Sequence, residues 1–242
     1  MIISVVIDCP KPPPPPGFKA QTMPTKSPPF TLTPIILKRV SEISEQIGRL
    51  SLQWQEYSNL TLRRINHIRT IQGSLAIEGN TLSTEQITAI LNGKRVIAPP
   101  KEIKEAQNAA AAYQHINTWQ ASSINDLLSA HKIMMSGLIK DAGQFRKGGV
   151  GVMSGDAVVH MAPQAHRVPR LMANLLAWLE ETDIPVLVAS CIFHYEFEFL
   201  HPFSDGNGRI GRLWQSQILS QWQPVFKDIP VESLIHQHQQ DY

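Results

Sequence analysis

Residues 201–212 form the most informative stretch of this chain, and they read His201-Pro202-Phe203-Ser204-Asp205-Gly206-Asn207-Gly208-Arg209-Ile210-Gly211-Arg212. Gly206, Asn207 and Gly208 permit a turned or left-handed backbone, and such a backbone can aim successive N–H groups at one point to bind an anion. A helix is expected to begin immediately afterwards, so that its N-terminal dipole faces the same anion. The stretch therefore predicts a phosphate-binding turn that leads into a helix.

Ionisable side chains around this turn supply the other parts of a phosphoryl or nucleotidyl transfer site. Arg209 and Arg212 are three residues apart, which places both guanidinium groups on one face of the expected helix. Asp205 can ligate Mg²⁺, an ion that binds phosphates with few protein carboxylates. His201 is a candidate general base near neutral pH. A glycine turn or a His-Pro pair alone is usually structural, but their combination here favours catalysis on a phosphate-bearing substrate.

On both sides of this stretch, apolar residues recur at spacings of three and four, which is typical of helices. Thr81 to Thr84 offer N-terminal caps to one of these helices, and Gly93 can end it. The predicted helices cover residues 35–54, 59–72, 81–93, 106–119, 124–138, 168–181, 186–200 and 209–221.

The segment 143–162 departs from the helical pattern. Its glycines flank two short β-prone pieces, residues 150–153 and 158–161. Such pieces, separated by turn-forming residues, predict a β-hairpin. The fold expected from the whole pattern is therefore all-α with one hairpin.

The composition indicates a soluble globular protein, because 43% of the residues are hydrophobic and 17% are charged. The formal net charge of +2 offers no electrostatic reason to expect a nucleic-acid partner. Cys9 and Cys191 are not expected to pair, and this cysteine usage suits a reducing compartment. The apolar start, Met1 to Ile7, is too short for a membrane span and lacks signal-peptide features. A cytoplasmic location without a membrane partner is expected.

Residues 201–212 resemble the signature of the Fic family, HPFx(D/E)GN(G/K)RxxR, at every specified position. The resemblance extends from about Pro29 to the end of the chain. It implies a Fic-type helical bundle that acts as a protein adenylyltransferase, with ATP and Mg²⁺ as cofactors. The product would be AMP on a Tyr, Thr or Ser hydroxyl of a target protein, with the enzyme itself as one expected target. UTP or another diphosphate-containing donor could occupy the same turn, and homodimer formation is a further expectation.

The resemblance also implies a role for each matched residue. His201 would deprotonate the target hydroxyl, which then attacks the α-phosphorus of ATP, while Asp205 would hold Mg²⁺. The turn formed by Gly206, Asn207 and Gly208 would cradle the phosphates. Arg209 would stabilise the β-phosphate side and Arg212 would contact the γ-phosphate. Gly208 stands where the phosphate-transferring Doc branch has lysine, which favours transfer of AMP.

Upstream, residues 74–80 read Ser-Leu-Ala-Ile-Glu-Gly-Asn and resemble the inhibitory motif (S/T)xxxE(G/N) of the same family. Ser74 and Glu78 are four apart and so share a helical face, and Gly79 is expected to end or bend that helix. In the family this glutamate pairs with the second arginine of the signature, here Arg212. The resemblance implies autoinhibition within one chain, because a carboxylate in the γ-phosphate subsite repels phosphate. Glu78 could instead position a water that removes AMP from a target.

The hairpin resembles the flap with which Fic proteins hold a target segment by strand addition. Val150, Gly151 and Val152 are the residues expected to pair with the target. Tyr242 matches the first of two tyrosines that line the adenine pocket in relatives, and the second has no counterpart here. An inactive, truncated nucleotide-binding module is therefore a third hypothesis.

Three regions are expected along the chain. Residues 1–30 are rich in proline, which fixes φ and lacks an N–H, and they predict a disordered tail. Residues 31–105 would form an N-terminal helical region that includes the inhibitory helix. Residues 106–242 would form a Fic catalytic core that is incomplete at its C-terminus.

Overall fold

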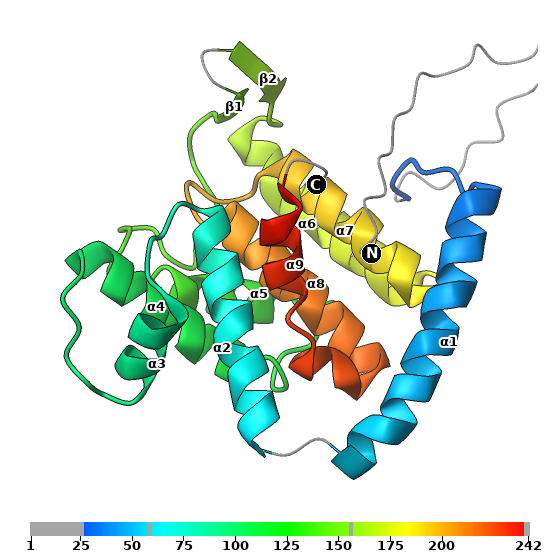
Figure 1. Ribbon diagram of the computed structural model, residues 1–242. Helices are drawn as coiled ribbons and strands as arrows, with labels where there is room; N and C mark the ends of the chain where they lie inside the picture. The colour runs from blue at the N-terminus through cyan, green and yellow to red at the C-terminus, as the bar shows by residue number, and fades with distance from the viewer. Residues whose placement is uncertain (1–26, 58–59, 155–156, 240–242) are drawn as a thin grey trace, which may run out of the picture.

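The computed structural model describes residues 27–57, 60–154 and 157–239, and these fold as α-helices with a single two-stranded hairpin (Figure 1). This confirms the predicted all-α fold with one hairpin. The α-helices are α1 (Pro34–Tyr57), α2 (Leu60–Ile77), α3 (Thr84–Leu91), α4 (Pro100–Gln114), α5 (Ile124–Met134), α6 (Val168–Glu181), α7 (Val186–Leu200), α8 (Asn207–Trp222) and α9 (Val231–Gln237). The hairpin is β1 (Gly151–Ser154) and β2 (Ala157–Met161), and two short 3₁₀ helices are η1 (Ala165–Arg167) and η2 (Pro224–Asp228).

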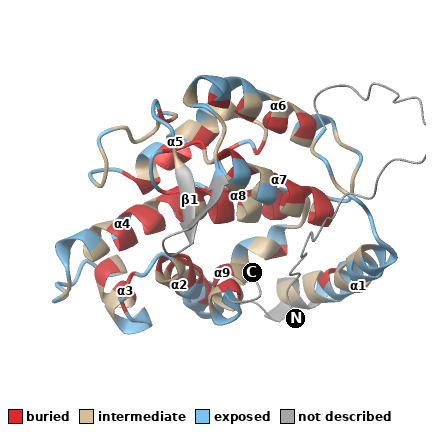
Figure 2. Ribbon diagram, turned by 90° about the horizontal axis from the view of Figure 1, so that it is seen from above, coloured by how far each residue is buried: buried red, intermediate tan, exposed pale blue. Residues whose placement is uncertain are grey.

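The core forms around α8, which packs against α7 along its length and also contacts α5 and α2. Phe193 and Phe197 of α7, Phe203 of the connecting loop and Trp214 of α8 are all fully buried. Burial of such aromatic side chains is a large source of stability. Figure 2 shows the buried residues concentrated on α4, α7 and α8. The segment predicted to bind phosphate therefore lies against the main hydrophobic core.

Two helices have the predicted limits, and they are α6 and α7. The prediction for α2 was too short, because the helix continues past Gln72 to Ile77. The helix continues through Gly73, and this glycine lies where the main chain of α9 passes close to α2. A Cβ at Gly73 would stand 2.5 Å from the nitrogen of Ser233. The expected inhibitory motif therefore begins inside α2.

Other predicted limits were also wrong. Helix α4 begins at Pro100 rather than at Ala106, because proline fits the first helical turn, where an N–H has no intrahelical acceptor. It ends at Gln114 rather than at Trp119. Helix α5 ends at Met134 rather than at Leu138, ahead of Gly137 with its positive φ of 72°. The helix predicted over residues 81–93 is shorter in the structure. It is α3, which begins after Ser83, and Ser83 forms a capping box with Gln86.

The hairpin protrudes from the helical body near α6 and α7 (Figure 1). Its strands are antiparallel, with Gly151 opposite Met161 and Ser154 opposite Ala157, and a bulge between Val152 and Met153. On another side, α1 packs Ile47 into a second, smaller apolar cluster with residues of α7, α8 and η2. No helix in the described part of the chain has the length and apolar character needed to cross a membrane. Most of the proline-rich region lies outside the described residues, and the division into three regions stays a prediction.

Candidate active site

The loop that joins α7 to α8 has a tightly specified backbone. His201 adopts the left-handed conformation (φ 47°), and its N–H donates to the carbonyl of Phe197. Gly206 is also left-handed (φ 84°), and a Cβ there would stand 2.6 Å from the sulfur of Met135, so only glycine fits. The side chain of Asn207 accepts from the N–H of Phe203 at 2.9 Å and donates to its carbonyl at 3.0 Å. Asn207 therefore braces the loop with its side chain, and only its main chain is placed to contact a phosphate.

Helix α8 begins at Asn207, two residues earlier than predicted. Asn207, Gly208 and Arg209 thus form its first turn, whose N–H groups have no intrahelical acceptors. The predicted anion turn is in consequence the helix N-terminus itself rather than a loop ahead of it. Main-chain donors and the helix dipole converge on one place, as anion binding requires.

His131 of α5 packs against the same loop, and the sequence did not indicate this role of His131. Its fully buried ring stacks on Phe203 with a centroid distance of 3.6 Å. The N–H of Gly143 donates to Nδ1 at 2.8 Å, so Nε2 carries the proton and donates to the carbonyl of Asp205 at 3.0 Å. Burial lowers the pKa of His131, which keeps the ring neutral.

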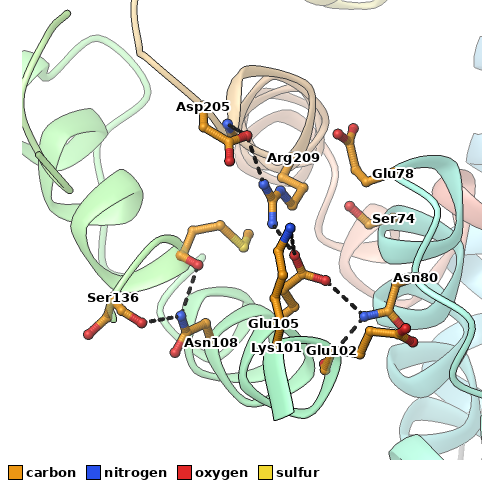
Figure 3. A network of polar contacts seen from close by, with 12 residues as sticks. Ser74, Glu78, Asn80, Lys101, Glu102, Glu105, Asn108, Ser136, Asp205 and Arg209 are labelled. Atoms are coloured by element: carbon orange, nitrogen blue, oxygen red, sulfur yellow. Dashed lines mark hydrogen bonds and ion pairs between the residues drawn. The ribbon is translucent and has the colours of Figure 1, made fainter. Parts of the chain in front are cut away.

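Arg209 is held between two carboxylates (Figure 3). It donates to Oδ1 of Asp205 at 3.1 Å and to Oε1 of Glu105 in α4 at 3.3 Å, and only 5% of its side chain is exposed. Asn80 in turn donates to the other oxygen of Glu105 at 3.0 Å. Sequence reasoning missed Glu105. Its one local signal in the sequence is that a carboxylate directly precedes an alanine-rich helical stretch, and the alanine-rich face of such a helix is expected to be buried.

The second arginine of the stretch contacts the end of α2. Arg212 donates to Oε1 of Glu78 at 2.6 Å and to the carbonyl of Ser74 at 3.0 Å, and 4% of its side chain is exposed. Gly79 follows with φ 85° and ends the helical path, as the sequence predicted. The pair expected between Glu78 and Arg212 is therefore present in the structure.

The Glu78 carboxylate also reaches the N-terminus of α8. A Cβ at Gly208 would stand 2.5 Å from Oε1 of Glu78 and 3.0 Å from a terminal nitrogen of Arg212. An anionic group thus already lies against the first turn of the helix, beside an arginine. The place suits a phosphate for the same physical reasons, since both are oxyanions that accept charge-assisted hydrogen bonds.

A second carboxylate, that of Glu198, lies close to α8 at Gly211 and interacts electrostatically with Arg212. Burial raises the pKa of Glu198 in α7 to about 7, although the positive charge of Arg212 opposes the shift. The neighbouring His194 has its pKa lowered to about 4, also by burial. Both side chains lie where a Cβ at Gly211 would clash with them. Close packing of α7 on α8 therefore places a carboxyl group and a neutral imidazole against Gly211, the residue before Arg212.

Asp205 is the one predicted metal ligand, and its surroundings fit a magnesium ion. Its side chain is 52% exposed, and both of its contacts with described residues use Oδ1. Oδ2 remains available to a cation that also binds phosphate oxygens. No group of three or more potential ligands from His, Cys, Asp and Glu occurs in the described ranges. Asp205 would contribute its carboxylate, and Mg²⁺ that binds with a nucleotide usually takes few carboxylates from the protein.

The remaining predicted site residues are those of the hairpin and Tyr242. Val150 immediately precedes β1, and Gly151 and Val152 are the first two residues of that strand, so the three residues are consecutive at the start of the hairpin. Strand addition uses the main-chain N–H and carbonyl groups along the edge of a strand, and β1 presents such an edge. Tyr242 lies outside the described residues.

Comparison with known proteins connects this site with one family. The sequence profile of the Fic/DOC family matches residues 121–219. The chain is 31% identical over 216 residues to protein adenylyltransferase fic-1 of Caenorhabditis briggsae, covering 82% of this chain and 40% of that protein. It is 29% identical over 177 residues to protein adenylyltransferase Fic of Aedes aegypti, covering 67% of this chain and 34% of the relative. The chain thus spans less than half the length of these curated relatives.

Solved structures agree with this similarity. The crystal structure of a Fic family protein from Desulfovibrio desulfuricans G20 is 55% identical and superimposes with a TM-score of 0.86, covering 89% of this chain and 66% of that one. Fic-1 from C. elegans (residues 134–508) superimposes with a TM-score of 0.64 at 24% identity, covering 78% of this chain and 59% of that one. The latter likeness concerns the fold alone.

Proposed function

Because this chain belongs to the Fic/DOC family, we propose that it transfers AMP from ATP to a hydroxyl side chain of a target protein. One observation carries the proposal. The N-terminus of α8 is an anion site bounded by Arg209 and Arg212, and His201 and Asp205 lie in the loop that leads into it. The names of the relatives, protein adenylyltransferases, support the same reaction.

In the proposed reaction, the target hydroxyl oxygen attacks the α-phosphorus of ATP. His201 accepts the hydroxyl proton, the bond between the α-phosphorus and the bridging oxygen breaks, and pyrophosphate leaves. Arg209 and Arg212 stabilise the charge that grows on the departing phosphates. Bound Mg²⁺, held by Asp205, would neutralise phosphate charge. The rigid backbone at His201 would align the base with the hydroxyl, which is how orientation lowers a barrier.

Transfer of AMP rather than phosphate is favoured by Gly208. In the Doc branch a lysine stands at this position, and its side chain would fill the space beside Arg212 that Gly208 leaves open. Here that space holds the Glu78 carboxylate and would admit phosphate oxygens once the carboxylate moves. The absence of a side chain at Gly208 therefore supports binding of the β- and γ-phosphates at the first turn of α8 once Glu78 has moved.

Glu78 is proposed to inhibit this reaction. Its carboxylate binds Arg212 and lies against Gly208, where the γ-phosphate would have to go. Two like charges so close repel each other strongly in a partly buried site. ATP then binds weakly or in a pose that places the α-phosphorus away from the target hydroxyl. The inhibitor belongs to the same chain, so the regulation would be intramolecular.

Removal of AMP from a modified target is a second candidate. One observation favours it. The Glu78 side chain is 32% exposed, so its carboxylate can contact water while Arg212 holds it in the site. A carboxylate in such a place can orient an attacking water as a general base. In this case Glu78 would be needed for activity rather than inhibit it.

The test of AMP transfer uses α-labelled ATP with Mg²⁺ and a cell lysate as acceptor. Wild type, Glu78→Gly and Glu78→Gly/His201→Ala are compared, with Glu78→Gln as the matched variant that keeps the side-chain size but loses the charge. We expect label on protein with Glu78→Gly, at least about tenfold more than with wild type, since each 1.4 kcal/mol of lost repulsion is a factor of ten. The double variant should give none. ATP binding by Glu78→Gly without any labelling would overturn the proposal.

The reverse reaction is tested on the protein labelled by Glu78→Gly. If wild type releases AMP from it and Glu78→Gln does not, the second candidate is supported. If neither releases AMP, the second candidate is excluded for that target.

A further inference from the structure

Arg146 lies in the loop between α5 and β1 and is almost fully buried, with 3% of its surface exposed. All four of its side-chain hydrogen bonds to described residues are donated to main-chain carbonyl oxygens. A buried cation is costly unless its donors are satisfied, and charge-assisted bonds to carbonyls are strong ones. The arrangement is therefore a built junction of several chain segments, and the acceptors show which segments it joins.

Two of the acceptors lie at the C-terminus of α7. The guanidinium donates to the carbonyl of His201 at 2.7 Å and to that of Leu200 at 3.3 Å. The main-chain N–H of Arg146 also donates to the carbonyl of Pro202 at 3.0 Å. The last carbonyls of a helix have no intrahelical donors and carry its negative dipole, so a cation is favourable there. Arg146 thus caps α7 at the residue whose left-handed backbone directs the candidate base.

The other two acceptors flank the hairpin. The same guanidinium donates to the carbonyl of Gly148 at 2.8 Å and to that of Pro163 at 2.5 Å. Gly148 precedes β1 and Pro163 follows β2, so both ends of the hairpin meet at one side chain. A guanidinium is planar and its donors point in fixed directions. The hairpin and the end of α7 are therefore held in one relative position by a single rigid group.

We propose that Arg146 is a positioning residue, which fixes the hairpin relative to His201 so that a target strand paired with β1 presents its hydroxyl to the imidazole. The proposal rests on the proposed function, because it concerns the alignment of the target with the base. The acceptors of Arg146 lie outside the first turn of α8, so loss of the Arg146 side chain should disturb the alignment of the target and leave ATP binding unchanged. Lysine cannot replace it, because one ammonium cannot span four carbonyls from three chain segments.

The test compares Arg146→Lys and Arg146→Gln, each in the Glu78→Gly background, with Arg170→Lys as the matched control. Arg170 is exposed on α6, so its replacement should change nothing. Three quantities are measured: the Kd for ATP, the rate of label transfer to protein from α-labelled ATP, and amide hydrogen exchange at residues 148–163 and 200–206. Both Arg146 variants should keep the Kd for ATP within about twofold of the parent. Their transfer rate should fall at least about tenfold, a loss typical of misaligned reacting groups, with faster exchange in both segments.

The outcomes separate this proposal from the proposed function. If the Glu78→Gly parent transfers no label, the proposed function fails, and hydrogen exchange alone then decides whether Arg146 joins the hairpin to the end of α7. With an active parent, an unchanged transfer rate or unchanged exchange in either segment overturns the proposal. An equal loss of ATP binding, or global unfolding of both Arg146 variants, would also overturn it. Such results would assign Arg146 to the nucleotide site or to the core as a whole.

Discussion

At the scale of single residues, the candidate site is defined by where charges are placed relative to water. Arg209 and Arg212 are both nearly inaccessible, and each has a carboxylate partner that keeps its charge compensated. Asp205 and Glu78 are the more exposed partners of the two pairs. The arginines are thus fixed in place, whereas the carboxylates lie at the side from which a nucleotide and its metal ion would arrive.

Glu198 leads to a prediction about stability and pH. Burial raises its pKa to about 7, above the ordinary value of 4.5. The folded state therefore holds the proton more tightly than the unfolded state, and stability should fall as pH rises from about 4.5 through 7. Between pH 5 and 8 the wild type should lose about 2 kcal/mol relative to Glu198→Gln, as the shift implies. Urea unfolding of both proteins at the two pH values measures this difference.

The comparison with Glu198→Gln is needed because His194 acts in the opposite direction. Burial lowers its pKa to about 4, so its contribution to stability is lost as pH falls from 6.5 towards 4. Both proteins contain His194, and its effect cancels in the difference. Parallel pH profiles for wild type and Glu198→Gln would show that the carboxyl is ionised throughout.

At the scale of elements, helix α2, which leads into the proposed inhibitory Glu78, is held by contacts with α8 and α9. Arg212 of α8 binds its C-terminal turn, and α9 crosses it so closely that Gly73 has no room for a side chain. Ser233 of α9 also donates to the carbonyl of Arg69 at 2.7 Å. The helix that leads into Glu78 is therefore part of the packed body, and the proposed inhibition would depend on the Glu78 side chain rather than on movement of a loose segment.

A matched pair of glycine substitutions tests this packing. Alanine in a helix interior is ordinarily about 0.5–1 kcal/mol more stable than glycine. A Cβ at Gly48 in α1 would have no atom within 4 Å, so Gly48→Ala should stabilise the protein by this amount. Gly73→Ala should instead destabilise it by about 1–3 kcal/mol, because the methyl group would meet the main chain of α9. Thermal or urea unfolding gives the sign of each change. Stabilisation by both substitutions would mean that α9 moves away from α2 at little cost in free energy.

At the scale of the whole molecule, the carboxylate of Glu78 is expected to contribute to stability as well as to the proposed inhibition. Its ion pair joins α2 to α8 in a site where Arg212 is almost fully buried. Removing one partner of such a pair leaves a desolvated charge and usually costs more than the pair itself contributes. Relief of inhibition should therefore come with a loss of stability in the absence of nucleotide.

Thermal unfolding with and without ATP and Mg²⁺ tests this coupling. Without nucleotide, Glu78→Gly should melt at a lower temperature than wild type. Saturating ATP should then stabilise the variant more than the wild type, by about 1.4 kcal/mol for each tenfold gain in affinity. Glu102→Gln is the control, because this carboxylate bonds to Thr81 and not to Arg212. The same ATP increment for wild type and Glu78→Gly would show that Glu78 does not obstruct the phosphate subsite.

The amino-acid sequence alone was sufficient for the features that depend on near neighbours. Apolar spacing predicted the helices, with correct limits for α6 and α7, because helical periodicity is a local property. The glycine-asparagine turn and its two arginines lie within twelve residues, so their spacing alone predicted that they meet at the N-terminus of one helix. The hairpin followed from β-prone pieces between glycines. Limits failed where a proline began a helix or a glycine continued one against a neighbouring backbone.

The groups that support the site came only from the tertiary structure. Glu105 meets Arg209 across 104 residues, His131 meets Asp205 across 74, and Arg146 meets His201 across 55. Local sequence gives at most a weak signal for these residues, since each is a single polar side chain in a helix or loop. Their significance lies in burial together with a distant partner, and the partner is chosen by the packing of whole elements. Residue types and short spacings thus indicated the chemistry, while the fold decided which side chains hold it in place.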